Sequence, residues 1–213
     1  MRRLQTGLLA TAGPILLAGA GLVHPAGLSA ATAHRWVHLH IVLLPIFPLL
    51  ALGFVVLLWG RPRADVPGVA TVVAWAGAGV YAIGYTGLDA VAGIAAGTVA
   101  GQDGDPAELR RLVLALYDVA DGLGRAGVYA FLLAVLAGTV ALAARHGPRV
   151  IAGSVVLLGA GYSFIDSHIF WPRGVLTMLA MAAGFALWTW AATPDTRTDH
   201  PAASSGPPAN QPA

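Results

Sequence analysis

The stretch Trp36–Trp59, WVHLHIVLLPIFPLLALGFVVLLW, decides the fold class, because it is almost wholly apolar and carries a tryptophan at each end. In an α-helix, the step from Trp36 to Trp59 covers roughly 35 Å. This length matches a bilayer hydrocarbon core of about 30 Å flanked by the interfacial layers in which Trp is enriched. The stretch therefore predicts a membrane-spanning helix.

The rest of the chain contains further apolar runs of the same character. The predicted spans are residues 7–24, 37–59, 68–100, 107–144, 150–168 and 174–192. The run 68–100 is too long for one straight crossing, so we expect a break near 84–89, where Gly84, Gly87 and Asp89 fall. The run 107–144 begins amphipathic. We expect an all-α, polytopic transmembrane helix bundle of about six spans in a single domain over residues 1–192, with a disordered tail over 193–213.

Composition supports a lipid environment and excludes several kinds of site. The chain is 57% hydrophobic and 10% charged, whereas soluble domains carry about 25% charged residues. It has no Cys, which excludes disulfides, thiolate metal ligands and iron–sulfur clusters. The net charge of +2 gives no reason to expect nucleic acid as a partner. The lipid bilayer of a bacterial cytoplasmic membrane is the expected surrounding.

Arginine, the only basic residue besides His, sets the expected orientation by the positive-inside rule. With the N-terminus inside, the inner arginines are Arg2, Arg3, Arg61, Arg63, Arg145, Arg149 and Arg197. The outer ones are Arg35, Arg110, Arg111, Arg125 and Arg173. The larger number of arginines on the inner side favours a topology with both termini inside (N-in, C-in).

The first span has an alternative interpretation. Arg2 and Arg3, the apolar run and the small residues 31–33 resemble a secretory signal with a cleavage site. The apolar run is long for a signal core, and the spacer from Pro25 to Ala33 is long as well. Cleavage would leave five spans and remove His24.

Glycine and proline mark where helices approach or bend. Gly93, Gly97 and Gly101 share one helix face, a pattern that lets two helices pack closely in lipid, either within the bundle or against a partner helix or second copy. Pro45 and Pro48 lie inside the second span and predict a kink there.

Polar residues gather at the span ends that this topology places outside. Five of the seven histidines and seven of the ten acidic residues fall on that side. They are His24, His34, His38, His40, Asp89, Asp103, Asp105, Glu108, Asp118, Asp121, Asp166 and His168. Ionisable groups at membrane depth are costly, so such a cluster is a hypothesis of a functional site.

The spacing of these residues selects the candidate ligands. His34 and His38 are four residues apart and share a helix face, which is the spacing of two histidines that bind one metal ion. His40 lies about 200° around the helix from His38. We expect His38, Asp89, Asp166 and His168 to line one pocket, with His24 and Asp118 at its edge. The candidate metal ligands are His38, His168, His24, Asp89 and Asp166, and the candidate catalytic groups are Asp89 and Asp166. Asp121 and Arg125 have the spacing of a helical ion pair.

Imidazole with carboxylate is a ligand set for zinc or iron, and two axial imidazoles would suit haem. Three functions remain open from the sequence. The first is a metal- or haem-binding membrane protein, in one version an enzyme that acts on a lipid or quinone. The second is a small ion- or proton-coupled transporter or channel with Asp89 as its ion site. The third is a non-catalytic scaffold subunit that binds a partner helix through its glycine face.

Overall fold

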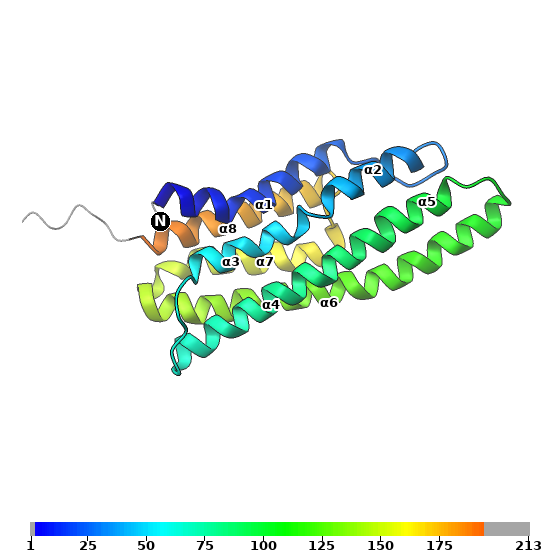
Figure 1. The fold of residues 1–213 in the computed structure, drawn as a ribbon. Coiled ribbons are helices and arrows are strands. Elements are labelled where there is room, and N and C mark those ends of the chain that lie inside the picture. The colour runs from blue at the N-terminus through cyan, green and yellow to red at the C-terminus, as the bar shows by residue number, and fades with distance from the viewer. Residues whose placement is uncertain (1–2, 194–213) are drawn as a thin grey trace, which may run out of the picture.

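The computed structural model describes residues 3–193, and in that part of the chain every regular element is helical (Figure 1). In chain order the elements are α1 (Arg3–Val23), α2 (Ala33–Leu43), η1 (Phe47–Ala51), α3 (Leu52–Leu57), α4 (Val66–Leu88), η2 (Asp89–Ala95), α5 (Ala96–Ala100), α6 (Pro106–His146), η3 (Gly147–Val150), α7 (Ile151–Ser167) and α8 (Arg173–Ala191). The prediction of an all-α chain is confirmed for these residues. The tail predicted to be disordered lies, from residue 194 onward, outside the described residues.

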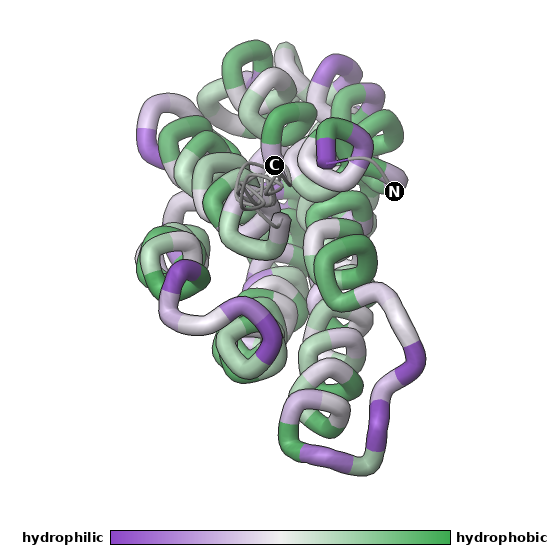
Figure 2. The backbone as a smooth tube through the Cα atoms, turned by 90° about the vertical axis from the view of Figure 1, so that its left-hand side faces the viewer, coloured by the Kyte–Doolittle hydropathy of each residue, from purple (hydrophilic) through white to green (hydrophobic). Residues whose placement is uncertain are grey.

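Five helical segments of the described residues are long and apolar enough to cross a membrane. They are Arg3–Val23, Ala33–Leu57, Val66–Ala100, Pro106–Ser167 and Arg173–Ala191. The fourth of these turns back at Gly147, whose φ of 72° is reached readily by glycine, so it contains both α6 and α7. Figure 2 shows hydrophobic residues along the helices and a run of hydrophilic ones in the loop between α3 and α4.

Local sequence explains where two of the longest helices begin. Asp65 precedes α4 and accepts a hydrogen bond from the Gly68 amide at 2.9 Å. Asp105 precedes α6 and accepts one from the Ala107 amide at 3.2 Å. In both helices a proline follows in the first turn, where its missing N–H costs nothing.

The second and third predicted spans depart from straight helices in different ways. Near Pro45 and Pro48 the α-helix stops at Leu43 and resumes at Leu52 after a 3₁₀ turn, and the Tyr81 hydroxyl donates to the Phe47 carbonyl at 3.3 Å. In the run 68–100 the chain stays helical: it widens into the π-helix η2 from Asp89 and does not fold back.

The core is built on aromatic rings and on close backbone contacts. Phe54, Phe131, Phe185 and Trp188 are fully buried, and Phe54 lies edge-on to the other three. Helices α4 and α6 pack along their lengths. At Gly77 an added Cβ would lie 2.7 Å from the Ala130 carbonyl oxygen, so only glycine permits this separation between the two backbones.

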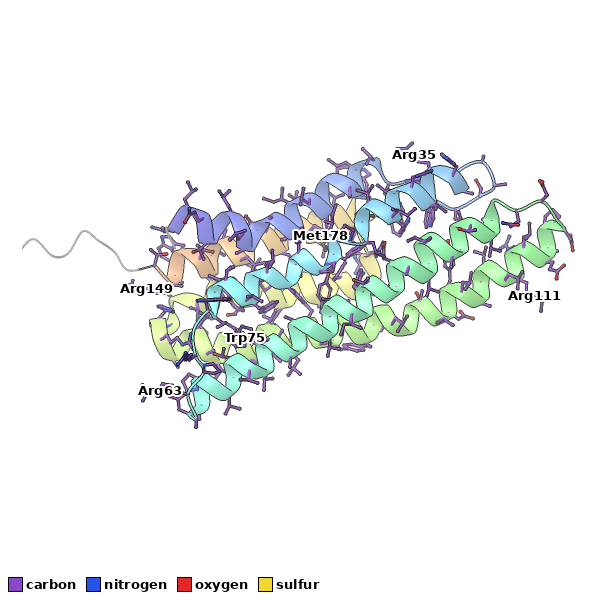
Figure 3. All side chains as sticks on the ribbon, in the orientation of Figure 1. Arg35, Arg63, Trp75, Arg111, Arg149 and Met178 are labelled. Carbon is purple, nitrogen blue, oxygen red and sulfur yellow. The ribbon has the colours of Figure 1, made fainter. Side chains whose placement is uncertain are left out.

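The two ends of the bundle differ in shape. In Figure 1, α2, α5 and the start of α6 extend well past the ends of α1, α7 and α8. Arginine lies at both ends, with Arg63 and Arg149 at one and Arg35 and Arg111 at the other (Figure 3). His24 and His168 directly follow α1 and α7, at the level where these two helices end and α8 begins.

Candidate functional site

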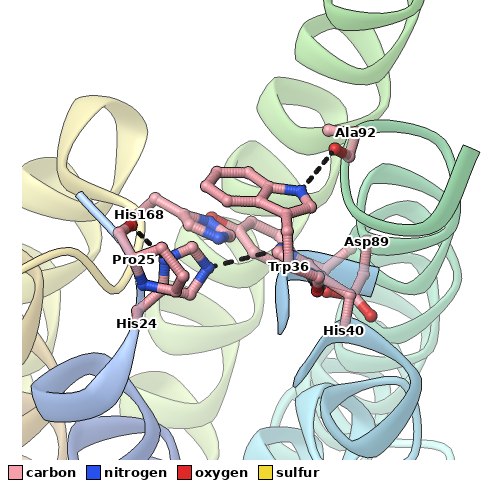
Figure 4. Close-up of polar contacts among 8 residues, drawn as sticks. His24, Pro25, Trp36, His40, Asp89, Ala92 and His168 are labelled. Carbon is pink, nitrogen blue, oxygen red and sulfur yellow. Dashed lines mark hydrogen bonds and ion pairs between the residues drawn. The ribbon is translucent and has the colours of Figure 1, made fainter. Parts of the chain in front are cut away.

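Three histidines and one aspartate from separate elements meet at this level, and we call His24, His40, Asp89 and His168 the polar centre (Figure 4). His24 directly follows α1, and His40 lies in the last turn of α2. Asp89 is the first residue of η2, and His168 directly follows α7. The centre therefore forms only when four distant chain segments pack together.

His24 and His40 face each other with their ring nitrogens. Nδ1 of His40 lies 2.7 Å from the Trp36 carbonyl oxygen, and Nδ1 of His24 lies 2.8 Å from the Pro25 carbonyl oxygen. A carbonyl only accepts, so both Nδ1 atoms carry the proton. Each neutral ring then has a lone pair on Nε2, and these two Nε2 atoms lie 3.4 Å apart. Two lone pairs at this separation need a positive species between them.

Asp89 adds a carboxylate that has no hydrogen-bond partner. Its side chain is 0% exposed, and neither Oδ1 nor Oδ2 has a hydrogen bond in the structure. Its Oδ1 lies 3.9 Å from Nε2 of His40. Burial of an unpaired carboxylate is strongly unfavourable, so this group also indicates a cation or proton as its missing partner.

Helix η2 creates the space for His40. A Cβ on Gly93 would lie 2.6 Å from the Cβ of His40 and closer still to its ring. π-helical turns are frequent at functional sites, because the extra residue changes the direction of neighbouring side chains. The indole Nε1 of Trp36 donates to the Ala92 carbonyl within η2 at 3.1 Å and so ties α2 to this turn.

His168 is held in an unusual backbone conformation. Its φ of 44° and ψ of −138° lie outside the regions that side chains other than glycine readily adopt. Its Nδ1 lies 3.1 Å from the hydroxyl of the buried Tyr85, on which the imidazole stacks. Burial, together with smaller contributions from the nearby His24 and His40, lowers the pKa of His168 to about 3. Burial likewise lowers the pKa of His24. Both imidazoles are therefore neutral at pH 7.

Several residues that the sequence suggested lie apart from the polar centre. His38 is exposed, and its Nε2 contacts that of the exposed His34 at 3.0 Å. His40, which the helical angle had separated from His38, faces the interior instead. Asp166 is exposed. The expected meeting of His38, Asp89, Asp166 and His168 is therefore not observed: only Asp89 and His168 of these four belong to the polar centre.

Two other candidate sets also differ from expectation. Asp121 and Arg125 are both exposed, and within residues 3–193 no salt bridge joins them. Asp118 is exposed as well and does not belong to the polar centre.

The glycine face packs against α2 of the same chain. A Cβ on Gly97 would lie 2.7 Å from Val37, and a Cβ on Gly101 would lie 3.3 Å from Ala33. Because α2 covers this face, the face is not open to a partner helix or a second copy.

No protein family model, curated protein or solved structure matches this chain. The site must therefore be interpreted from its own geometry. In the part of the chain that the structure describes, no three or more His, Asp or Glu side chains are arranged to hold a metal ion as they stand. The two facing imidazoles have their Nε2 atoms 3.4 Å apart, and Asp89 Oδ1 lies 3.9 Å from Nε2 of His40.

Sequence reasoning missed three residues of the site, His40, Tyr85 and Trp36. The sequence shows that His40 shares a helix face with Trp36, four residues earlier, and the structure shows that this face is the buried one. Tyr85 had no such signal, because its partner His168 is 83 residues away.

Proposed function

We propose that this chain is a membrane protein that binds one divalent metal ion of the zinc class between His24, His40 and Asp89. The carrying observation is the pair of Nε2 atoms 3.4 Å apart, each bearing a lone pair because a carbonyl binds the proton on Nδ1. Two nitrogens that ligate one tetrahedral zinc at 2.0–2.1 Å lie roughly 3.3–3.4 Å from each other. The carbonyls that orient the rings correspond to the outer-shell partners typical of metal-binding histidines.

Asp89 supplies the third ligand and the balancing charge. Its Oδ1 lies 3.9 Å from His40 Nε2, about half an ångström beyond the spacing of two ligands on one zinc. A small rotation of the carboxylate closes this gap. Three protein ligands leave a fourth position for water or substrate, the arrangement of catalytic rather than structural zinc.

Helix lengths support an outer-surface location for this centre. Helix α1 has 21 residues and α8 has 19, roughly 32 and 29 Å, which matches one bilayer core. Helix α6 has 41 residues, roughly 62 Å, so it extends beyond the bilayer. On our proposal the bundle crosses a bacterial cytoplasmic membrane six times with both termini inside, and the polar centre lies at the outer interface.

Orientation is testable because the chain has no cysteine of its own. Single substitutions Ala64→Cys and Gln102→Cys place a thiol in the loops at opposite ends of α4 to α5. A membrane-impermeant maleimide should label Gln102→Cys in intact cells and Ala64→Cys only after permeabilisation. The reverse pattern would refute the N-in orientation.

Metal binding is tested on the full chain in detergent, loaded with Zn²⁺ and measured by elemental mass spectrometry. We expect one zinc per chain. His24→Ala, His40→Ala and Asp89→Asn should each weaken binding by more than about tenfold, the least that even an outer-shell change usually causes. The double variant His34→Ala/His38→Ala is the matched control, since it removes two exposed histidines, and it should bind normally. Zinc that is absent, or lost only in the control variant, would refute the proposal, and a Soret band would indicate haem instead.

The geometry also accommodates a proton between the two imidazoles, which favours proton-coupled transport as the second candidate. One shared proton satisfies both Nε2 atoms and gives Asp89 an opposite charge at 3.9 Å. Proteoliposomes should then show a proton flux that Asp89→Asn abolishes. Unchanged flux in that variant would leave a structural role for the polar centre.

A further inference from the structure

A long cavity of about 1100 Å³ lies beside the polar centre. One wall is a single face of α6 that begins at Pro106 and ends at Val128. This step of 22 positions corresponds to roughly 33 Å of helix. The opposite walls come from the loop 27–30, from α2 and η2, and from the turn between α7 and α8. The cavity is therefore elongated along α6.

The cavity walls combine apolar, hydrogen-bonding and charged side chains. The inner end is formed by Trp36, Tyr85, Val128 and His168, and the wall along α6 presents apolar and aromatic side chains such as Val113. Five exposed charged side chains also line the cavity: Asp103, Arg110, Asp121, Arg125 and Asp166. These charges carry both signs and do not favour a simple anion or cation. The apolar wall indicates a hydrocarbon ligand.

The inner end offers hydrogen bonds at a position that the backbone holds under strain. The Tyr85 hydroxyl and His168 Nδ1 lie 3.1 Å apart, and both residues line the cavity together with His40. His168 keeps a φ of 44°, which is costly for a residue other than glycine. Strain of this kind concentrates at ligand-binding positions, which gives a second and independent indication of a ligand.

We propose that this cavity binds one elongated amphiphile, whose oxygen-bearing head lies at Tyr85 and His168 and whose single hydrocarbon chain extends along α6. The head can belong to a fatty acid or to an isoprenoid quinone, which share an oxygen acceptor on a long chain. This inference does not depend on a metal ion at the polar centre.

The test uses the full chain in amphipol and a fluorescent polyene fatty acid as the probe. Saturated fatty acids of 8 to 18 carbons and a decyl quinone then compete for the site. Affinities are expressed relative to the ligand dissolved in water. On this scale we expect each added methylene group to raise the affinity roughly fourfold, because its burial is worth about 0.8 kcal/mol. Stronger competition by the quinone at equal chain length would identify the quinone as the better ligand. A fatty acid that competes better would identify an acyl lipid. Affinity that does not depend on chain length for either head would overturn the proposal.

A matched pair of variants separates the cavity from the outer surface of α6. Val113→Trp fills the cavity wall, whereas Val119→Trp makes the same change at a side chain that is 58% exposed and does not line the cavity. We expect Val113→Trp to weaken probe binding at least tenfold and Val119→Trp to change it less than twofold. Leu109→Trp, also on the cavity wall, provides a second blocking variant if Val113→Trp does not fold. Equal binding by the blocking and control variants would refute the proposal.

Discussion

Replacement of Gly93 by alanine tests how the π-helix and the polar centre depend on each other. The new Cβ would lie 2.6 Å from the Cβ of His40 and closer to its ring, whereas carbon atoms in contact normally lie about 3.5–4.0 Å apart. The overlap is therefore about 1 Å. The Cβ of His40 is fixed to the backbone, so α2 itself must move away from η2.

The expected change in the free energy of unfolding follows from two opposing contributions. Overpacking of a filled interior costs about 1–3 kcal/mol, and alanine in place of a helical glycine returns up to about 1 kcal/mol. Because the Cβ of His40 cannot rotate away, the cost lies at the upper end, about 3 kcal/mol, and we expect Gly93→Ala to lower the free energy of unfolding by about 2 kcal/mol. It should also weaken Zn²⁺ binding, because His40 moves away from His24.

The assay is thermal unfolding of the purified chain in detergent, with Gly79→Ala as the matched control. A Cβ on Gly79, in α4, would meet no atom within 4 Å, so this change should stabilise the chain by about 0.4–1 kcal/mol. The two variants are thus expected to shift the melting temperature in opposite directions. If Gly93→Ala is as stable as Gly79→Ala, the described packing of His40 on η2 is wrong.

Three further predictions concern His168 and Tyr85, each measured by the same unfolding assay. His168→Gly should be more stable than His168→Ala by about 1 kcal/mol or more, because both lose the ring while only glycine relieves the strain at φ 44°; equal stability would argue against strain. Burial lowers the pKa of His168 to about 3, so the unfolded chain binds this proton first below pH 6.5, and His168 alone should lower stability by about 1.4 kcal/mol per pH unit between pH 6.5 and pH 3; a slope unchanged in His168→Gln would contradict this assignment. Tyr85→Phe should cost about 1 kcal/mol, the usual value of one buried hydrogen bond, and a neutral effect would show that the hydroxyl does not bond to His168.

The helical class could be read from the sequence, because long apolar runs and their flanking tryptophans follow from bilayer dimensions alone. Pro45 and Pro48 also predicted the interruption between Leu43 and Leu52, since proline lacks the backbone N–H that donates the helical hydrogen bond. The π-helix at Asp89 could not be read in this way. It depends on the packing of Gly93 against His40, a contact between residues 53 positions apart.

The candidate site was only partly predictable for a related reason. His24, Asp89 and His168 stood out because each lies at the end or inside of an apolar run. The choice between His38 and His40 depends on which face of α2 turns inward, and Trp36 decides this through its bond to the Ala92 carbonyl. That bond joins two helices, so periodicity within α2 does not reveal it.

The mismatch in helix length is the feature that joins the polar centre to the cavity. Helices α1 and α7 end, and α8 begins, at the same level. His24 and His168, which follow α1 and α7, come together there. The longer segments Val66–Ala100 and Pro106–His146 continue past that level, and their excess length provides the walls of the cavity. A buried acid such as Asp89 would be costly at the centre of a bilayer. On our proposal this level is the outer interface, so the acid lies where the two long segments leave the lipid and their extra turns enclose the cavity.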